Sequence, residues 1–165
     1  MGQRGTCANR ERPGEVTAPA GSPVSKPPAV IHVEWGGEHL FDAGRPGGPT
    51  MHIDASGKTA QSPVDTLLSA LATCTASDVV DILEKRRTPI ESMQIDVVGE
   101  RVDTVPRRFR HITLTFHIAG RGIEREQAER AIDLSVNKYC SVRDSLSRDV
   151  VVDWKLDLKP EKGTE

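Results

Sequence analysis

The sequence predicts an α+β fold with a mostly antiparallel sheet and two main helices, in the order βββ-α-ββ-α-β. Apolar and polar residues alternate in six short segments, and two longer segments carry apolar residues at helical spacing. Most neighbouring strand segments are separated only by short turns, which join antiparallel strands. We therefore expect strands paired mainly as hairpins, with two helices inserted between them.

The composition is that of an ordinary globular domain. Of the 165 residues, 36% are hydrophobic, 28% charged and 4% aromatic. The 22 Lys and Arg residues against 24 Asp and Glu residues give a net charge of −2, which provides no general attraction to nucleic acid or to a membrane. No apolar run approaches the roughly 18 residues of a membrane span, and no apolar stretch follows the N-terminus. We therefore expect a cytoplasmic protein.

We expect one folded domain, residues 30–158, between a disordered N-terminal arm, residues 1–29, and a short C-terminal tail, residues 159–165. The arm holds five of the eleven prolines, and its few apolar residues follow no period. It also contains Cys7, which we expect to be an exposed bystander thiol.

The domain begins with a predicted three-stranded meander. Ile31, Val33 and Trp35 alternate with polar residues, which predicts a half-buried strand with Trp35 packed inward. A Gly-Gly turn leads into a second short strand, and a third strand follows the Arg-Pro-Gly-Gly-Pro break and ends at Asp54.

A long helix follows the meander. Ser62 and Pro63 are typical of a helix start, and Asp65 lies in the first turn, where a carboxylate suits the positive end of the helix dipole. The helix is expected to reach Arg86 or Arg87, because Pro89 prevents its continuation.

The second half of the domain is predicted to be a long hairpin, a helix and a last strand. Alternating apolar residues mark the two hairpin strands, with Phe116 inward. Residues 122–140 form an amphipathic helix, and residues 149–158 form a strand with Trp154 inward.

Both cysteines of the predicted domain lie at the border of a helical apolar face. Cys74 is flanked on the helical wheel by apolar residues and by Asp78 and Asp81, and Cys140 ends the second helix. A cysteine in such a place is either a small inert packing residue or a reactive thiol. The position at the border of the apolar face modestly favours a reactive thiol over an inert packing residue.

The sequence contains no other pattern that carries chemistry. It has no C-x-x-C motif, its five histidines are scattered, and it has neither a G-x-S-x-G sequence nor a phosphate-binding glycine loop. The arginines Arg107, Arg108 and Arg110 cluster at a turn without an aromatic platform, which favours a solvated turn over a nucleic-acid contact. We expect neither a metal nor an organic cofactor.

The segments SPVDTLLSALATCTASDVVDILEKRR and NKYCSVRDSL resemble the OsmC family, which includes the organic hydroperoxide resistance proteins. The resemblance covers residues 30–158. Its specific parts are a proline eleven residues before the first cysteine, the Ala-Thr-Cys-Thr sequence, and Tyr-Cys-Ser-Val at the end of the second helix. It implies an intertwined homodimer in which Cys74 and Cys140 approach each other near the subunit interface.

The resemblance also implies an activity. Cys74 would attack an organic hydroperoxide, Cys140 would resolve the sulfenic acid as a disulfide, and an external dithiol would reduce the pair again. The first hypothesis is therefore a thiol-dependent peroxidase of oxidative stress defence. The alternative is a non-catalytic or weakly catalytic dimer of the same fold that binds a small molecule or senses redox state.

Two positions depart from the family pattern. Family members use an arginine from the first hairpin and a glutamate after the helix-opening proline, where this chain has Glu38 in the hairpin and Val64 after the proline. Asp65, Arg45 or an arginine of a partner chain remain as replacements. Because a cation lowers a thiol pKa and neighbouring carboxylates raise it, this sequence predicts slow peroxide turnover.

Overall fold

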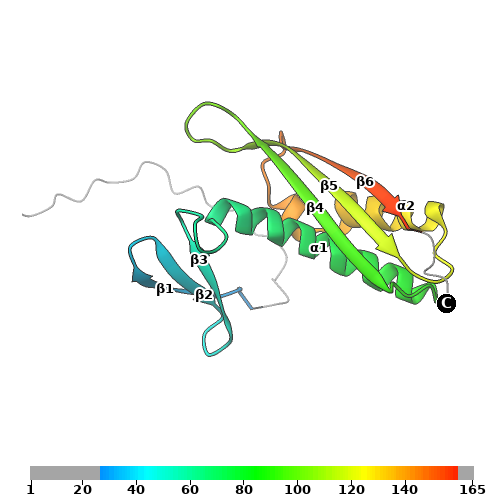
Figure 1. Cartoon of the computed structure of the whole chain (residues 1–165), viewed down its shortest axis with the longest axis horizontal. Helices are drawn as coiled ribbons and strands as arrows, with labels where there is room; N and C mark the ends of the chain where they lie inside the picture. The colour runs from blue at the N-terminus through cyan, green and yellow to red at the C-terminus, as the bar shows by residue number, and fades with distance from the viewer. Residues whose placement is uncertain (1–26, 160–165) are drawn as a thin grey trace, which may run out of the picture.

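The computed structural model describes residues 27–159 (Figure 1). The predicted arm up to residue 26, with Cys7, and the tail from residue 160 lie outside the described residues. The order of strands and main helices confirms the βββ-α-ββ-α-β prediction. The elements are β1 (His32–Gly37), β2 (Leu40–Gly44), β3 (Thr50–Asp54), α1 (Pro63–Lys85), β4 (Ser92–Arg101), β5 (Phe109–Ala119), α2 (Arg125–Leu134), the π-helical turn η1 (Ser135–Tyr139), α3 (Ser141–Asp144) and β6 (Val151–Leu158).

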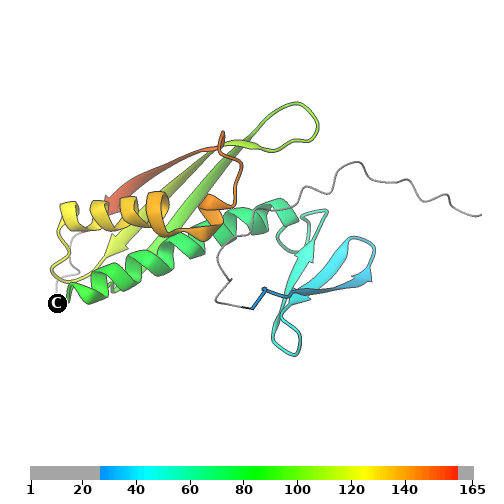
Figure 2. The same ribbon diagram turned by 180° about the vertical axis from the view of Figure 1, so that it is seen from behind.

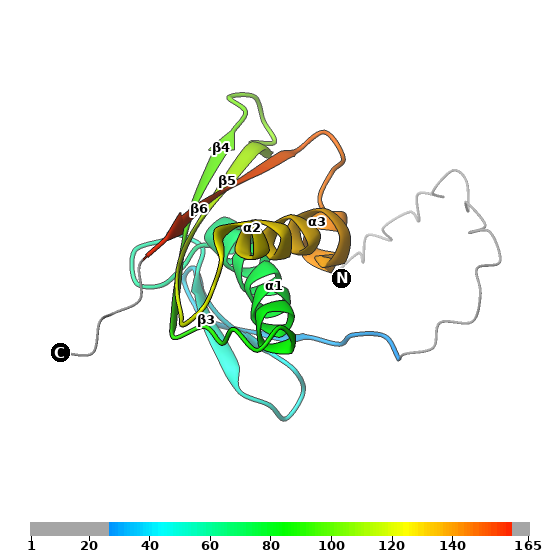
Figure 3. The same ribbon diagram turned by 90° about the vertical axis from the view of Figure 1, so that its right-hand side faces the viewer.

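The body of the molecule has two layers, a β4-β5-β6 sheet and the helices α1 and α2 on one of its faces (Figures 1 and 3). The core lies between the layers, because alternate residues of β5 and one face of each helix point into it. Phe116 is fully buried, as the alternation predicts, and Trp154 is partly buried against this core. Other fully buried core side chains are Leu71, Val79, Leu83, Leu114, Ile118 and Ile132.

The sheet is mixed at one edge. β4 and β5 form the predicted antiparallel hairpin, whereas β6 pairs parallel to β5, from His111 opposite Val151 to Ile118 opposite Leu158. The parallel pairing follows from the intervening helices, because α2 and α3 carry the chain back to the other end of the sheet. Three of the four strand pairs in the described residues are antiparallel, so the mostly antiparallel prediction holds.

α1 begins as the sequence predicts, with a reciprocal capping box. The Ser62 hydroxyl accepts from the Asp65 N–H at 3.2 Å, and the Asp65 carboxylate accepts from the Ser62 N–H at 3.0 Å. The Ser62 hydroxyl and N–H donors hold the pKa of Asp65 below its usual range. The helix ends at Lys85 with Arg86 as its cap, within the predicted limits.

By length and composition α1 could cross a membrane. Its Leu71, Val79 and Leu83 side chains are fully buried in the protein core, as in the central helix of a globular domain.

The β1-β2-β3 sheet lies beside the N-terminal end of α1, apart from the body (Figure 1). The prediction of a half-buried first strand is wrong for this chain, because Val33 is 57% and Trp35 65% exposed. Cross-strand pairing places Val33 and Trp35 on one face with Phe41, Met51 and other apolar residues. No described element covers this face. The alternation of apolar and polar residues in β1 therefore produces an exposed apolar surface, not a face buried within the chain.

The loop between β3 and α1 is organised by Asp54, which is 2% exposed. Its carboxylate accepts from the main-chain N–H and the hydroxyl of both Ser56 and Thr59, and from the Lys58 N–H, at 2.6–3.1 Å. These donors, Ser56 first, hold the pKa of Asp54 far below its usual range. The loop that joins the small sheet to α1 is therefore held in one conformation by hydrogen bonds to the Asp54 carboxylate.

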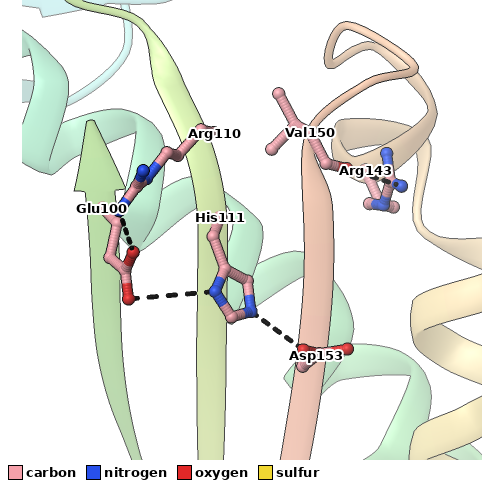
Figure 4. Close-up of polar contacts among 6 residues, drawn as sticks. All are labelled: Glu100, Arg110, His111, Arg143, Val150 and Asp153. Carbon is pink, nitrogen blue, oxygen red and sulfur yellow. Dashed lines mark hydrogen bonds and ion pairs between the residues drawn. The ribbon is translucent and has the colours of Figure 1, made fainter. Parts of the chain in front are cut away.

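The outer face of the β4-β5-β6 sheet is polar and carries cross-strand ion pairs (Figure 4). His111 lies between Glu100 at 3.8 Å and Asp153 at 2.8 Å, and Arg110 binds the same Glu100 at 3.0 Å. The three strands are thus tied across their solvent side as well as through the core.

Candidate functional site

The structure brings Cys74 and Cys140 together, although 66 residues separate them in the sequence. Cys74 lies in the middle of α1 and is partly buried, and Cys140 stands between η1 and α3 and is 4% exposed. η1 and α3 lie against α1 (Figure 2). The two thiols are neighbours, close enough for Cys74 to raise the pKa of Cys140, and both are free. Neighbouring thiols on two segments that pack together are candidates for a disulfide.

The position of Cys140 depends on a change of helix type. The prediction of one α-helix through residue 140 is wrong, because α2 ends at Leu134 and the chain continues as a π-helical turn. The Cys140 N–H donates to the Ser135 carbonyl oxygen at 2.9 Å, which is the i to i+5 bond of a π-turn. Cys140 itself is extended, with φ −69° and ψ 103°. The turn ends the helix at the place where the thiol meets α1.

Ser135 fastens this turn to α1. Its fully buried hydroxyl lies 2.9 Å from the Thr75 carbonyl oxygen and 3.1 Å from an oxygen of the Asp78 carboxylate. Asp78, which the sequence placed only as an acidic neighbour of Cys74, is therefore a hydrogen-bond acceptor for the opposite segment. Ser135 was not identified from the sequence, because neither the π-turn nor the contact between helices leaves a local pattern.

The Cys140 thiol is held in its protonated form. Burial raises its pKa to about 11, and the contact with Cys74 adds to this effect. The Arg143 N–H, which donates to Cys140 Sγ at 3.3 Å, acts in the opposite direction but does not outweigh burial. A buried, protonated thiol is poorly suited to make the first attack on a substrate.

A cavity of about 550 Å³ opens beside Cys140, on the side formed by η1, α3 and the residues that follow. Three cationic side chains line it, those of Lys138, Arg143 and Arg148. The Arg143 guanidinium donates to the Val150 carbonyl oxygen at 3.1 Å, which fixes it at the wall (Figure 4). A ligand of moderate size can therefore reach the neighbourhood of Cys140.

The residues considered as substitutes for the family's arginine and glutamate lie elsewhere in this chain. Asp65 is engaged in the capping box of α1, about two and a half helical turns before Cys74. Arg45 lies in the exposed turn between β2 and β3, where its carbonyl oxygen accepts from the Gly48 N–H at 2.9 Å. Glu38 occupies the β1-β2 turn with φ 46°. Within residues 27–159 of one chain, none of these three side chains contacts Cys74.

Among residues 27–159, no group of three or more His, Cys, Asp or Glu side chains is arranged to hold a metal ion. The chemistry that the described site offers is that of its thiols.

Comparison with known proteins identifies the family. The model of the family described as OsmC-like protein matches residues 55–155, which is more than half of the chain and includes both cysteines. The protein YhfA of Escherichia coli K12 is 42% identical over 87 residues, which cover 53% of this chain and 65% of YhfA. The matched part thus spans just under two thirds of this relative's length.

Solved structures show the same fold. A hypothetical protein from Aquifex aeolicus is 23% identical, with a TM-score of 0.74 over 83% of this chain and all of the other. The organic hydroperoxide resistance protein OhrB of Bacillus subtilis is 18% identical, with a TM-score of 0.52 over 80% of this chain and 98% of the other. At these identities the likeness concerns the fold alone.

Proposed function

This chain belongs to the OsmC-like protein family, and we propose that it is a thiol-dependent peroxidase that reduces organic hydroperoxides through Cys74 and Cys140. The observation that carries the proposal is that the segments bearing these two cysteines, α1 and the η1–α3 junction, pack together and make the two thiols neighbours. A redox role is supported at the level of the family. The two-cysteine mechanism is our proposal for this chain.

The two thiols differ in exposure, and this difference indicates which cysteine attacks the hydroperoxide and which one resolves the sulfenic acid. Cys74 is partly exposed and is the attacking cysteine, whereas Cys140 is buried and protonated and acts second. The Cys74 thiolate attacks the terminal oxygen of the hydroperoxide, the O–O bond breaks, and the alcohol leaves after taking a proton. Cys74 is now a sulfenic acid.

Cys140 then attacks the sulfenic sulfur of Cys74, its thiol proton is lost, and the hydroxyl leaves as water. The product is a Cys74–Cys140 disulfide, which protects Cys74 from over-oxidation. An external dithiol returns both cysteines to thiols, taking the two oxidising equivalents with it.

A second copy of the chain completes this proposal. The β1-β2-β3 sheet exposes Val33, Trp35 and Met51 on one face, and large apolar faces of this kind are typical of subunit interfaces. We therefore propose a homodimer in which this face packs on the partner chain. In that proposed dimer, an arginine of the partner chain would be the replacement for the family's arginine at Cys74.

The experiment is a peroxidase assay with purified full-length protein, an alkyl hydroperoxide and a dithiol. The wild type should consume hydroperoxide, Cys74→Ser should lose the activity, and Cys140→Ser should be inactivated within a few turnovers as Cys74 over-oxidises. Cys7→Ser is the matched control and should behave as the wild type. A Cys74→Ser variant with full activity would contradict the proposal. Reversible disulfide formation without turnover would instead favour the redox-sensing alternative.

A further inference from the structure

The cavity formed by η1, α3 and the residues that follow is positively charged, whereas the chain as a whole is slightly negative. Its volume is about 550 Å³, and its charged lining residues are Lys138, Arg143, Asp144 and Arg148. Three cations against one carboxylate give the lining a formal net charge of +2, while the whole chain carries −2. Positive charge is thus concentrated in one concave place, where the surrounding protein strengthens its electric field.

No carboxylate of residues 27–159 neutralises these three cations. Lys138, Arg143 and Arg148 form no ion pair with a described residue, and Asp144 of the same lining pairs with none of them. The Lys138 ammonium lies 5.5 Å from the centre of the Tyr139 ring, which attracts the ammonium but does not cancel its charge. The like charges around the cavity repel one another, and a bound anion would relieve that repulsion.

The carboxylate that follows Arg148 in the sequence is engaged elsewhere. Asp149 binds the Arg108 guanidinium of the β4-β5 hairpin at 2.6 Å, and it also accepts from the Ser147 hydroxyl. The Ser147 hydroxyl first, and then Arg108, hold the pKa of Asp149 below its usual range. The Arg148 side chain is therefore left for a ligand.

Hydrogen bonds hold the segment that carries the two arginines. The Arg143 guanidinium donates to the Val150 carbonyl oxygen at 3.1 Å (Figure 4). The Val150 N–H donates to the Ser147 carbonyl oxygen at 3.0 Å, and the Leu146 N–H donates to the Arg143 carbonyl oxygen at 3.2 Å. A guanidinium has five N–H donors, so the bond to Val150 leaves others for a ligand. A cavity wall fixed in this way loses little conformational freedom when a ligand binds.

The lining is suited to a phosphate group on a small organic molecule. A guanidinium binds phosphate oxygens through two parallel hydrogen bonds, and an ammonium adds a point charge. A phosphate monoester carries a charge of about −1.5 to −2 at pH 7, which balances the lining. The cavity is many times larger than the roughly 30 Å³ that one water molecule occupies, so a free phosphate ion would fill only a small part of it. Asn137, Ser141 and Ser145 offer polar groups to the rest of a ligand.

We propose that this cavity is a binding site for a small-molecule phosphate monoester. Arg143 and Arg148 bind the phosphate oxygens, Lys138 supplies the third positive charge, and the polar remainder of the lining faces the organic part. The site goes beyond the proposed function, because ligand binding there requires neither a reaction of the cysteines nor a redox step.

The test is isothermal titration calorimetry on the full-length, reduced protein at low ionic strength. The three compounds titrated are glucose 6-phosphate, glucose and inorganic phosphate. Glucose 6-phosphate should bind at least about fivefold more tightly than inorganic phosphate, and glucose should not bind measurably. Salt at about 0.5 M should weaken the binding of glucose 6-phosphate about tenfold, because it screens the charges.

The variants Lys138→Gln and Arg148→Gln should each weaken the binding of glucose 6-phosphate about fivefold. Both side chains are exposed, so the Tm without ligand should stay unchanged, whereas the rise in Tm that the ligand causes in the wild type should shrink. The matched control is Lys155→Gln, which removes one positive charge from the outer face of β6 and should keep the wild-type affinity. Cys74→Ser should also keep it, since the site does not depend on thiol chemistry.

Equal binding of glucose and glucose 6-phosphate would overturn the inference. Inorganic phosphate that binds as tightly as glucose 6-phosphate would overturn the assignment to an organic ester. Unchanged affinity in both Lys138→Gln and Arg148→Gln would place the ligand outside this cavity. An equal loss of affinity in Lys155→Gln would show an effect of overall charge instead of a site.

Discussion

The hydroxyl of Ser135 lies 2.9 Å from the carbonyl oxygen of Thr75, and this contact joins the two segments that carry the cysteines. Thr75 directly follows Cys74 in α1, and the Ser135 carbonyl oxygen accepts from the Cys140 N–H at 2.9 Å. One buried serine thus holds both sulfur-bearing segments through its side chain and its main chain.

Replacing this serine by alanine should loosen the cysteine pair. Ser135→Ala leaves the Thr75 and Asp78 acceptors with one donor fewer in a buried place, so we expect it to lower the free energy of unfolding by about 1–3 kcal/mol. Formation of the Cys74–Cys140 disulfide by a mild oxidant should also become slower. Denaturant unfolding and thiol titration measure the two effects. Ser145→Ala, at an exposed hydroxyl that bonds within its own segment, is the control and should change neither much.

The Cys140 thiol should resist alkylation in the folded protein. With a pKa of about 11, roughly one Cys140 thiol in a thousand is ionised at pH 8, against about a quarter of unperturbed cysteines. Iodoacetamide should therefore modify Cys140 about 100-fold more slowly in the native than in the unfolded protein, as followed by peptide mapping. Equal rates in the two states would show that burial does not protect this sulfur.

The loop around Asp54 should stabilise the protein only while its carboxylate is ionised. The pKa of Asp54 is lowered on folding, so its contribution is fully present above the unfolded value of about 3.9 and is lost as pH falls toward the folded value. Asp54→Asn should lower the Tm by several degrees between pH 5 and 7 and by less near pH 3. Thermal unfolding across this range checks the prediction. Asp103→Asn, at an exposed turn carboxylate, should leave the Tm nearly unchanged.

The contribution of His117 to stability should have the opposite pH dependence to that of Asp54, so that it is lost as pH rises. Asp157 at 2.8 Å and Asp96 at 3.0 Å raise its pKa, so the imidazolium stabilises the fold below the unfolded value of about 6.5. This contribution is lost as pH rises through the higher folded pKa. His117→Gln should therefore destabilise most at pH 6 and least at pH 9. A loss of Tm that does not vary with pH would contradict the ionic origin. The control is His32→Gln, at an exposed imidazole that contacts no carboxylate of residues 27–159.

The apolar face of the small sheet should hold two chains together. We expect two chains per particle in sedimentation at micromolar concentration, and we expect Trp35→Glu to shift the protein toward monomers, because it places a charge in that face. Val105→Glu, at a side chain that is 90% exposed in the β4-β5 turn, should leave the assembly unchanged. A monomeric wild type would count against the homodimer and against a partner-chain arginine at Cys74.

What the sequence determined by itself is local. The start of α1 at Ser62 follows from a reciprocal bond between residues three positions apart, and the strand segments follow from alternation within a few residues. The inward direction of Phe116 was equally predictable, because the neighbouring strand and helices of the same chain cover that side of β5.

Other features were decided only by the tertiary structure. The exposure of Trp35 depends on which element covers its face, and alternation alone does not contain that information. The parallel pairing of β6 depends on the path of the chain through α2, η1 and α3. Cys74 and Cys140 become neighbours where the π-turn and the bond from Ser135 to Thr75 join segments 60 residues apart. Such contacts form when packed helices bury polar groups that must then find partners, and this pairing is a property of the folded chain rather than of any one segment.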